Sequence, residues 1–391
     1  MTIIAPQNFA ELSDAMMQIV ADKTPITIAA MGTKQGLGKP VQTSHHLDIS
    51  ALAGVMDYEP EELIITAHAA TPLAEIEALL AQHNQMLAFE PPHLDRLYGT
   101  ASTGTIGGAL LANLSGPRRL SQGAARDFLL GFEGVSGRGT GFRSGSKVVK
   151  NVTGYDLSKL LCGSFGTLAV IDEITLKTLP APETSLSLIV ANPDLERVAA
   201  AARAALKTAY EPSATAVLPK GAHEMSQSAA IAVIRFEGVA VSVNDRFEKL
   251  QKELAAFGHT DKLAQDASLS LWRDIADVAL LDHGHQIWRI SMAPSQGPAI
   301  LEQIEQQMDV AAYFDWAGGL LWLSCDKEDA HQIIRKALHN NGGGHATLMR
   351  GSDELRETVP VFEPLAIPLA ALNKRVQDAF DPHGLLNPGR L

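Results

Sequence analysis

Cysteine is scarce in this sequence, where Cys162 and Cys325 are the only two in 391 residues. Two cysteines cannot form a disulfide framework. Nor can they supply the clustered thiolates that a cysteine-ligated zinc or iron–sulfur site needs. Free thiols are typical of a reducing compartment. A disulfide-rich secreted domain is therefore excluded, and so is a chain that carries its own cysteine-bound cluster.

Positive charge and long apolar runs are also lacking. The chain has 32 Lys and Arg against 44 Asp and Glu, a formal net charge of −12. Without a Lys/Arg run, this argues against a nucleic-acid binder or a surface that docks on anionic lipid. No apolar stretch approaches the roughly 18 residues of a transmembrane helix. The first residues do not read as a signal peptide, so we expect a cytoplasmic chain.

The length suggests two or three domains, at about 150 residues each. Pro180 and Pro182 indicate a boundary, because proline neither donates to a strand ladder nor continues a helix. We predict a first domain over 1–180, with subdomains of about 1–70 and 71–180. A second domain over 181–325 is expected to form an open sheet with helices on one face. Residues 326–391 form a C-terminal segment.

Hydrophobic periodicity predicts the main elements. The predicted helices are 8–21, 73–80, 106–114, 195–209, 243–257 and 329–340. The predicted strands are 26–30, 62–69, 168–179, 185–190, 230–238 and 286–292.

A glycine-rich loop, Met31–Pro40, follows the strand predicted at 26–30. Glycine permits positive φ and lets backbone N–H groups approach phosphate oxygens. The loop is neither a GxGxxG sequence that opens a helix nor a P-loop, because no GK[ST] follows. The Rossmann and P-loop interpretations therefore fail on spacing. Taken alone, the loop is either a phosphate cradle or an ordinary turn.

Two further segments are rich in glycine. Gly99–Arg119 contains a predicted helix that begins at Gly104–Thr105. Two interpretations are open. The first N–H groups of the helix could face an anion or a ring carbonyl of a ligand. Alternatively, the small residues allow the helix to pack closely on the sheet. Lys147–Leu176 places Gly154 and Asp156 before a short helix, and two more glycines before a strand.

Together these segments resemble the FAD-binding domain of the vanillyl-alcohol oxidase/para-cresol methylhydroxylase superfamily. The third segment, KVVKNVTGYDLSKLLCGSFGTLAVIDEITL, is long and specific, and the C-terminal FDPHGLLNPGRL is also characteristic. Within the superfamily the chain is similar to the FAD-binding (E) subunits of bacterial glycolate oxidases, over nearly its whole length. The segments that carry this similarity are EPPH (90–93), GPRR (116–119), QIWRIS (286–291), DWAGGLLWL (315–323) and GGHAT (343–347).

The resemblance implies an α+β chain. It would have a PCMH-type FAD-binding domain of two α/β subdomains, an α+β cap domain, and a C-terminal segment that returns to the FAD domain. Members with covalent flavin carry His in the first loop or Cys in the second. Here the first loop has Thr33, Lys34 and Gln35, and no Cys precedes Cys162. We therefore expect FAD to be bound non-covalently.

The resemblance also implies which residues contact FAD. The first loop would hold the pyrophosphate, the second would lie beside the pyrophosphate and flavin, and the third would close over the cofactor. The predicted FAD-binding residues are Gly32, Thr33, Lys34, Gln35, Gly36, Gly104, Thr105, Gly107, Gly108, Arg118, Gly154, Gly163, Ser164, Gly166, Thr167, Ile171 and Asn387.

Oxidation of a 2-hydroxy acid needs a cation for the carboxylate and a base for the hydroxyl proton. Arg289 lies in an apolar strand, so it either binds an anion or pairs with a buried acid. His345 is either a base, a hydrogen-bond donor to a flavin carbonyl, or a turn residue. Arg118 and Arg119 would reach substrate or flavin, or face a partner. Trp316 is predicted to belong to the core.

The resemblance implies an FAD-binding subunit of a heteromeric glycolate oxidase that oxidises glycolate to glyoxylate. Electrons would leave through an iron–sulfur subunit, because this chain has too few cysteines. A second, paralogous flavin subunit would carry the metal and the catalytic histidines. His283–His285 is interpreted here as a surface turn, without a metal. Through its partners the complex would lie at the inner face of the plasma membrane.

Two alternatives stay open at this point. The chain could be a self-contained FAD-linked 2-hydroxy-acid dehydrogenase of the D-lactate type. It could also be an assembly subunit with a vestigial flavin site.

Overall fold

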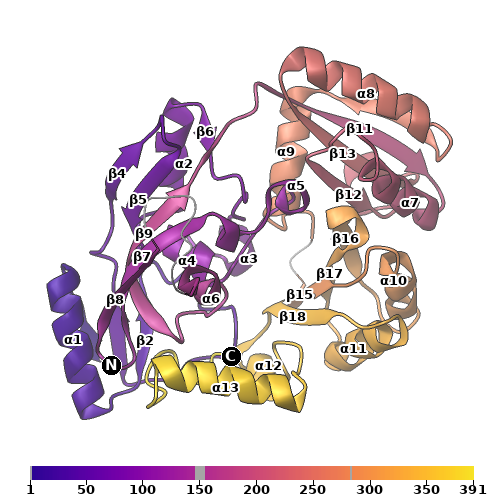
Figure 1. Ribbon diagram of the computed structural model, residues 1–391. Coiled ribbons are helices and arrows are strands. Elements are labelled where there is room, and N and C mark those ends of the chain that lie inside the picture. The colour runs from indigo at the N-terminus through magenta and orange to yellow at the C-terminus, as the bar shows by residue number, and fades with distance from the viewer. Residues whose placement is uncertain (1, 146–154, 282–283) are drawn as a thin grey trace. The chain divides into compact units, whose positions relative to one another are not determined.

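The computed structural model describes residues 2–145, 155–281 and 284–391. These residues form two compact units (Figure 1). The first unit comprises the chain up to Ser115, Ala124–Ala181 and Pro364–Leu391. The second comprises Gly116–Gly123 and Pro182–Glu363. Within the described ranges, no helix has the length and apolar character needed to cross a membrane.

The unit borders refine the predicted domains. One crossing falls between Ala181 and Pro182, beside the prolines that suggested a boundary. The chain returns to the first unit at Pro364, later than the predicted start of the C-terminal segment at 326. The reason is that residues 326–363 supply a helix and a strand that complete the sheet of the second unit.

The first unit begins with a small parallel sheet in the order β1–β3–β2. Its strands are β1 (Thr2–Ile4), β2 (Ile26–Ala29) and β3 (His45–Asp48). Helix α1 (Phe9–Asp22) buries Leu12, Met16 and Ile19 on one side. As predicted, Asn8 caps this helix, and its Oδ1 accepts a hydrogen bond from the Glu11 backbone N at 3.0 Å.

An antiparallel sheet in the order β4–β5–β9–β7–β8 forms the rest of this unit's framework. Its strands are β4 (Val55–Glu59), β5 (Ile64–His68), β7 (Leu129–Ser136), β8 (Gly141–Gly145) and β9 (Ala169–Lys177). The other elements here are α2 (Leu73–Gln82), β6 (Gln85–Met86), α3 (Asp95–Tyr98), α4 (Ile106–Leu111), α6 (Leu157–Leu161) and β10 (Leu179–Pro180). Apolar residues of β5, α2, α4 and β9 share one buried core.

Helix α4 packs unusually close to the sheet. The Thr105 side chain caps the helix by accepting from the Gly108 N at 3.2 Å. A Cβ on Gly107 would lie 2.6 Å from the Ala69 carbonyl oxygen, so only glycine fits there. The helix ends at Leu111 instead of the predicted residue 114. Asn113 has a φ of 50°, a left-handed conformation that a helix cannot continue.

The C-terminal residues return to β2 after helix α13 (Ile367–Phe380). The Ile26 N donates to the Leu385 carbonyl at 2.8 Å, and the Asn387 N donates to the Ile26 carbonyl at 3.0 Å. The Asn387 Oδ1 accepts from the Ile28 N at 2.9 Å. The tail therefore lies beside the strand that leads into the first glycine loop.

The second unit is built on one large antiparallel sheet in the order β14–β11–β13–β12–β16–β17–β15–β18. Its strands are β11 (Thr184–Asn192), β12 (Ala214–Leu218), β13 (Ala230–Gly238), β14 (His259–Leu263), β15 (Gln286–Ser291), β16 (Ala311–Asp315), β17 (Leu320–Cys325) and β18 (His345–Arg350). Four helices pack on one face: α7 (Leu195–Ala205), α8 (Ala240–Leu254), α10 (Gly297–Glu305) and α11 (Ala330–Asn340). The expectation that the helices cover one face only is wrong, because a further helix packs on the opposite face, where its Trp272 donates to Ser187.

The opposite face of this sheet carries polar side chains, because successive residues of a strand point to opposite sides. Trp288 and Ile290 of β15 belong to the helix-covered core, which places Arg289 between them on the other face. By the same alternation Arg235 and Glu237 of β13 lie on this polar face. Helix α9 (Gln265–Ala276) packs here. The Ile275 carbonyl of α9 accepts from the Tyr313 hydroxyl at 2.8 Å.

The substitution Gly107→Ala tests the packing of α4. We expect it to lower the stability of the chain by about 1–3 kcal/mol, because the new methyl group collides with a backbone carbonyl that cannot rotate away. Thermal unfolding of the FAD-free chain measures the effect. Gly108→Ala on the same helix is the control, because its Cβ would meet only side-chain atoms, at 3.3 Å or more. Equal losses for both variants would contradict this account.

Candidate functional site

A cleft in the first unit gathers most of the residues predicted to contact FAD. Its empty volume is about 790 Å³, with the open solvent at its mouth included. The first glycine loop, α4, the start of β9 and the C-terminal tail line it. The predicted residues among the lining are Gly32, Thr33, Lys34, Gln35, Thr105, Gly107, Gly108, Gly166, Ile171 and Asn387.

The remaining predicted FAD residues lie elsewhere. Gly36 packs against the Tyr98 ring, which a Cβ would approach to 2.7 Å. Gly104 lies behind the cleft wall, beside Thr33 and Lys34. Gly154 lies outside the described residues. The others, Gly163, Ser164 and Thr167, are not part of the lining.

Some of the lining was not predicted. Arg390 lines the cleft and donates from Nη2 to the Lys34 carbonyl at 2.6 Å, which ties the tail to the first loop. The sequence signal for Arg390 is its place in the NPGRL motif, which also contains Asn387, a predicted FAD-binding residue. Ala69, Leu111 and Phe165 also line the cleft. Apolar residues of this kind have no sequence signature that separates them from ordinary core residues.

Lys34 gives the cleft its positive charge. Its Nζ has no hydrogen-bond or ion-pair partner among the described residues, and burial lowers its pKa to about 8. Gly104 leaves the space that the ammonium occupies, because a Cβ there would lie 2.6 Å from Nζ. The cleft therefore suits a ligand that brings negative charge.

The second unit contains a separate cluster of positive charge, on the polar face of its sheet. The Arg289 guanidinium lies 5.0 Å from the centre of the Trp316 ring, and that of Arg119 lies 4.9 Å from the same ring. Burial and, to a smaller extent, the nearby charge of Arg119 lower the pKa of Arg289 to about 10, while the Asp315 carboxylate acts in the opposite direction. No acid in the described ranges forms an ion pair with Arg289. Of the two predicted roles, this geometry favours anion binding over a buried ion pair.

Trp316 is buried, as predicted, but it also lies in a strained turn. Trp316 and Ala317 have φ values of 53° and 56°, and Gly318 follows with 94°. Such left-handed conformations cost non-glycine residues about 1–3 kcal/mol each and are enriched at functional sites. The Asp315 carboxylate accepts from the Trp316 N at 2.7 Å, and the indole N–H donates to the Gly116 carbonyl at 3.2 Å. These bonds hold the ring beside the two guanidinium groups.

His345, the predicted base, begins β18 and is exposed. Ser291 pairs with His345 and Arg289 pairs with Thr347, so His345 and Arg289 lie on the same face of neighbouring strands. Of the predicted surface turn, His283 lies outside the described residues. His285 is exposed, and its N donates to Asp326 Oδ1 at 2.7 Å. No group of His, Cys, Asp or Glu in the described ranges is arranged to hold a metal ion.

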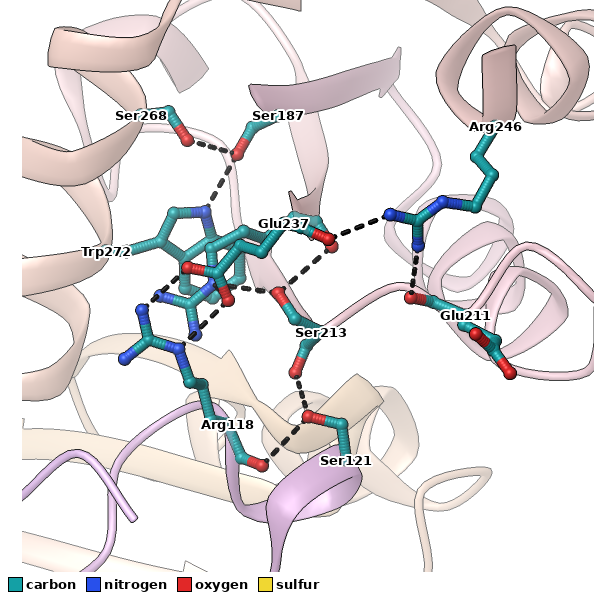
Figure 2. Close-up of polar contacts among 10 residues, drawn as sticks. Arg118, Ser121, Ser187, Glu211, Ser213, Glu237, Arg246, Ser268 and Trp272 are labelled. Atoms are coloured by element: carbon teal, nitrogen blue, oxygen red, sulfur yellow. Dashed lines mark hydrogen bonds and ion pairs between the residues drawn. The ribbon is translucent and has the colours of Figure 1, made fainter. Parts of the chain in front are cut away.

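Arg118, which is also predicted to contact FAD, does not line the cleft. Figure 2 shows its guanidinium on the Glu237 carboxylate of β13, with Nε–Oε2 at 2.9 Å and Nη2–Oε1 at 2.6 Å. Both residues belong to the second unit. In the structure the Arg118 guanidinium is thus engaged by Glu237, and its contact with FAD stays a prediction.

Comparison with known proteins agrees with this architecture. Residues 2–145 match the FAD binding domain family. The chain is 36% identical to the glycolate oxidase subunit GlcE of Escherichia coli, over 97% of this chain and 96% of that protein. The chain belongs to the GlcE family. It is thus an FAD-linked oxidoreductase subunit, as the sequence motifs predicted.

More distant relatives extend the comparison. The glycolate oxidase subunit GlcD of Bacillus subtilis is 24% identical over 100% of this chain and 88% of that protein. The structure of p-cresol methylhydroxylase superposes with a TM-score of 0.73 at 14% identity, over 99% of this chain and 88% of that chain. The predicted α+β fold of the para-cresol methylhydroxylase type is confirmed.

The depressed pKa of Lys34 makes a prediction for the FAD-free protein. Between pH 8 and 10.5 the Lys34 side chain is protonated in the unfolded chain but largely neutral in the folded chain. The free energy of unfolding therefore rises with pH over this range. We expect Lys34→Met to stabilise the FAD-free chain by up to about 3 kcal/mol at pH 7. The difference from wild type should vanish above pH 10.5. Denaturant unfolding at pH 7 and pH 10.5 measures both values. A variant less stable than wild type at pH 7 would show that the ammonium has a stabilising partner.

Proposed function

We propose that this chain is the FAD-binding subunit of a heteromeric glycolate oxidase, which oxidises glycolate to glyoxylate. The observation that carries the proposal is the unpartnered Lys34 ammonium in a glycine-lined cleft. A buried cation is costly without a counter-ion, and the diphosphate of FAD supplies one. The relationship to GlcE of Escherichia coli supports the choice of complex and substrate.

The first loop would hold the diphosphate through Lys34 and the backbone N–H groups of Gly32–Gly36. Binding would be non-covalent, because Thr33, Lys34 and Gln35 stand where members with covalent flavin carry His. Burial raises the pKa of Cys162 to about 12, so this thiol is not a nucleophile at neutral pH.

Bound FAD supplies the acceptor for the two electrons that leave C2 of the hydroxy acid. The contribution of this chain's second unit is electrostatic. Arg289 and Arg119 would neutralise the substrate carboxylate, and the Trp316 ring would keep both guanidinium groups in place. His345 lies on the same face of the sheet and is the candidate to accept the hydroxyl proton.

Transfer of the electrons onward requires other subunits. The two cysteines of this chain lie in different units, Cys162 in the first and Cys325 in the second, so they are unsuited to hold a cluster together. We therefore propose an iron–sulfur subunit and a paralogous flavin subunit as partners. The GlcD relationship supports the paralogue, because the two sequences align over the whole chain. The complex would lie in the cytoplasm, at the inner face of the plasma membrane.

Reconstitution with FAD tests the cleft. We expect Lys34→Met to weaken FAD binding roughly ten- to a hundredfold, as for the loss of one charge-assisted hydrogen bond. Flavin fluorescence titration of the FAD-free chain gives the Kd. Lys39→Met is the control, because this exposed lysine lies on the same loop but does not line the cleft. The flavin should also leave the protein on acid precipitation. Equal Kd values for both variants would remove Lys34 from the site.

Anaerobic addition of glycolate tests the reaction. We expect the flavin of the co-purified complex to be bleached, and the flavin of the isolated chain to stay oxidised. In the complex, Arg289→Met should raise the KM for glycolate roughly ten- to a hundredfold, because a carboxylate contact is lost. Arg197→Met is the control, on the exposed side of α7 across the sheet.

Other outcomes of the same experiment identify the alternatives. Bleaching by the isolated chain would favour a self-contained 2-hydroxy-acid dehydrogenase. A purified chain without flavin absorbance, in a complex that is active all the same, would favour an assembly subunit.

A further inference from the structure

The segment Gly116–Gly123, which we call the arm, belongs to the second unit although both of its neighbours in sequence, Ser115 and Ala124, belong to the first. It contains only the short helix α5 (Arg119–Gln122). A helix of this length is not stable by itself in water. Its conformation must therefore be maintained by contacts with the rest of the second unit.

The Arg118–Glu237 pair is the strongest of those contacts. The pair is bidentate, and the two side chains are only 11% and 8% exposed. Weaker contacts accompany it. The Ser121 hydroxyl donates to the Ser213 carbonyl at 2.8 Å, and the Gly116 carbonyl accepts from Trp316 Nε1. A buried bidentate guanidinium–carboxylate pair is much stronger than a single neutral hydrogen bond.

The position of Glu237 is maintained by residues outside the arm (Figure 2). Arg235 is 1% exposed and lies 3.5 Å from the Glu237 carboxylate. Its guanidinium stacks on the Trp272 ring at 4.6 Å, and its Nε donates to the Ser213 hydroxyl. Arg246 donates to the Glu237 carbonyl at 2.8 Å. Glu237 therefore keeps its position without the arm, whereas the arm can leave the second unit if its bonds to Glu237 are lost.

Substitutions at Arg118 and at Glu237 should have different consequences for the second unit. Without Arg118, Glu237 keeps Arg235 as its counter-ion. No buried charge among the described residues then lacks an opposite charge at this place, so the second unit stays folded. Without Glu237, the fully buried Arg235 loses its carboxylate, which destabilises the unit itself. A substitution at Arg118 therefore separates arm release from unfolding.

The residue next to Arg118 completes the positive cluster. Arg119 lies over Trp316 from the arm, while Arg289 reaches the same ring from β15. We propose that Arg118 is a positioning residue. Its pair with Glu237 fixes the arm on the second unit, holds Arg119 over Trp316, and so completes the cluster that binds the substrate carboxylate. This inference rests on the proposed function for the identity of the substrate.

Arg118→Met is the variant that tests the inference, with Arg118→Lys as the conservative replacement. Arg126→Met is the matched control, because this exposed arginine lies just beyond the arm and has no contact with Glu237. The full chain, loaded with FAD and co-purified with its partners, is used for kinetics. Hydrogen exchange of the full chain reports on the arm itself.

For Arg118→Met we expect amide exchange across residues 116–123 to accelerate at least about tenfold, because the arm opens locally while the sheet stays protected. The KM for glycolate should rise roughly tenfold with kcat nearly unchanged, because carboxylate binding is lost equally from ground and transition states. Arg118→Lys should recover part of the affinity, and Arg126→Met should match wild type in both measurements.

Two results overturn the inference. Arm exchange as slow as in wild type would mean that the pair does not hold the arm. Accelerated exchange with an unchanged KM would mean that the arm does not position the carboxylate site. Failure of the proposed function is a different result, in which the wild-type complex does not oxidise glycolate while the arm still opens in Arg118→Met.

Discussion

The functional parts of this protein depend on one constraint. In each unit a positively charged side chain is buried without a carboxylate among the described residues that pairs with it. The chain as a whole is acidic, with a net charge of −12. Yet the described residues leave the ammonium of Lys34 and the guanidinium of Arg289 without an ion-pair partner. Each group is desolvated, and a bound anion would stabilise its charge further. The folded chain is therefore organised to receive two different anions, one in each unit.

The two positive sites are maintained by different means. Lys34 occupies space that exists because Gly104 has no side chain, and the close approach of Gly107 to Ala69 draws α4 against the sheet beside it. The cluster in the second unit depends on a strained turn at Trp316 and on the arm. The chain that lines the cleft through Ala112 continues within four residues into the arm. One continuous stretch of sequence thus contributes to both sites.

Much of the fold follows from local sequence patterns. The Asn8 cap and the apolar spacing predict α1, which the structure contains. One crossing between the two units falls at Ala181–Pro182, beside the prolines that indicate a boundary. The glycine loop and the NPG tail indicated residues that meet in one cleft, although they are more than 300 positions apart in sequence. Long motifs made this possible, because they are recognisable where single glycines are not.

Other features depend on tertiary contacts that no local pattern encodes. The resemblance implies a contact between Arg118 and FAD, whereas the structure pairs Arg118 with Glu237, which lies 119 residues away in sequence. The extent of the second unit was underestimated because β18 pairs with β15 across a long separation. The two guanidinium groups on Trp316 come from distant segments as well. Such pairings become visible only when the sheet is assembled.

The return of the C-terminal tail to β2 has a consequence for biosynthesis. Asn387 bonds to the strand that enters the first glycine loop, and Arg390 bonds to the carbonyl of Lys34. While these residues are still inside the ribosome, one wall of the cleft is missing, whatever has already folded upstream. The cleft is therefore complete only after the segment through Arg390 has been synthesised and has folded back onto β2, and a nascent chain that stalls short of Asn387 has a groove without this wall.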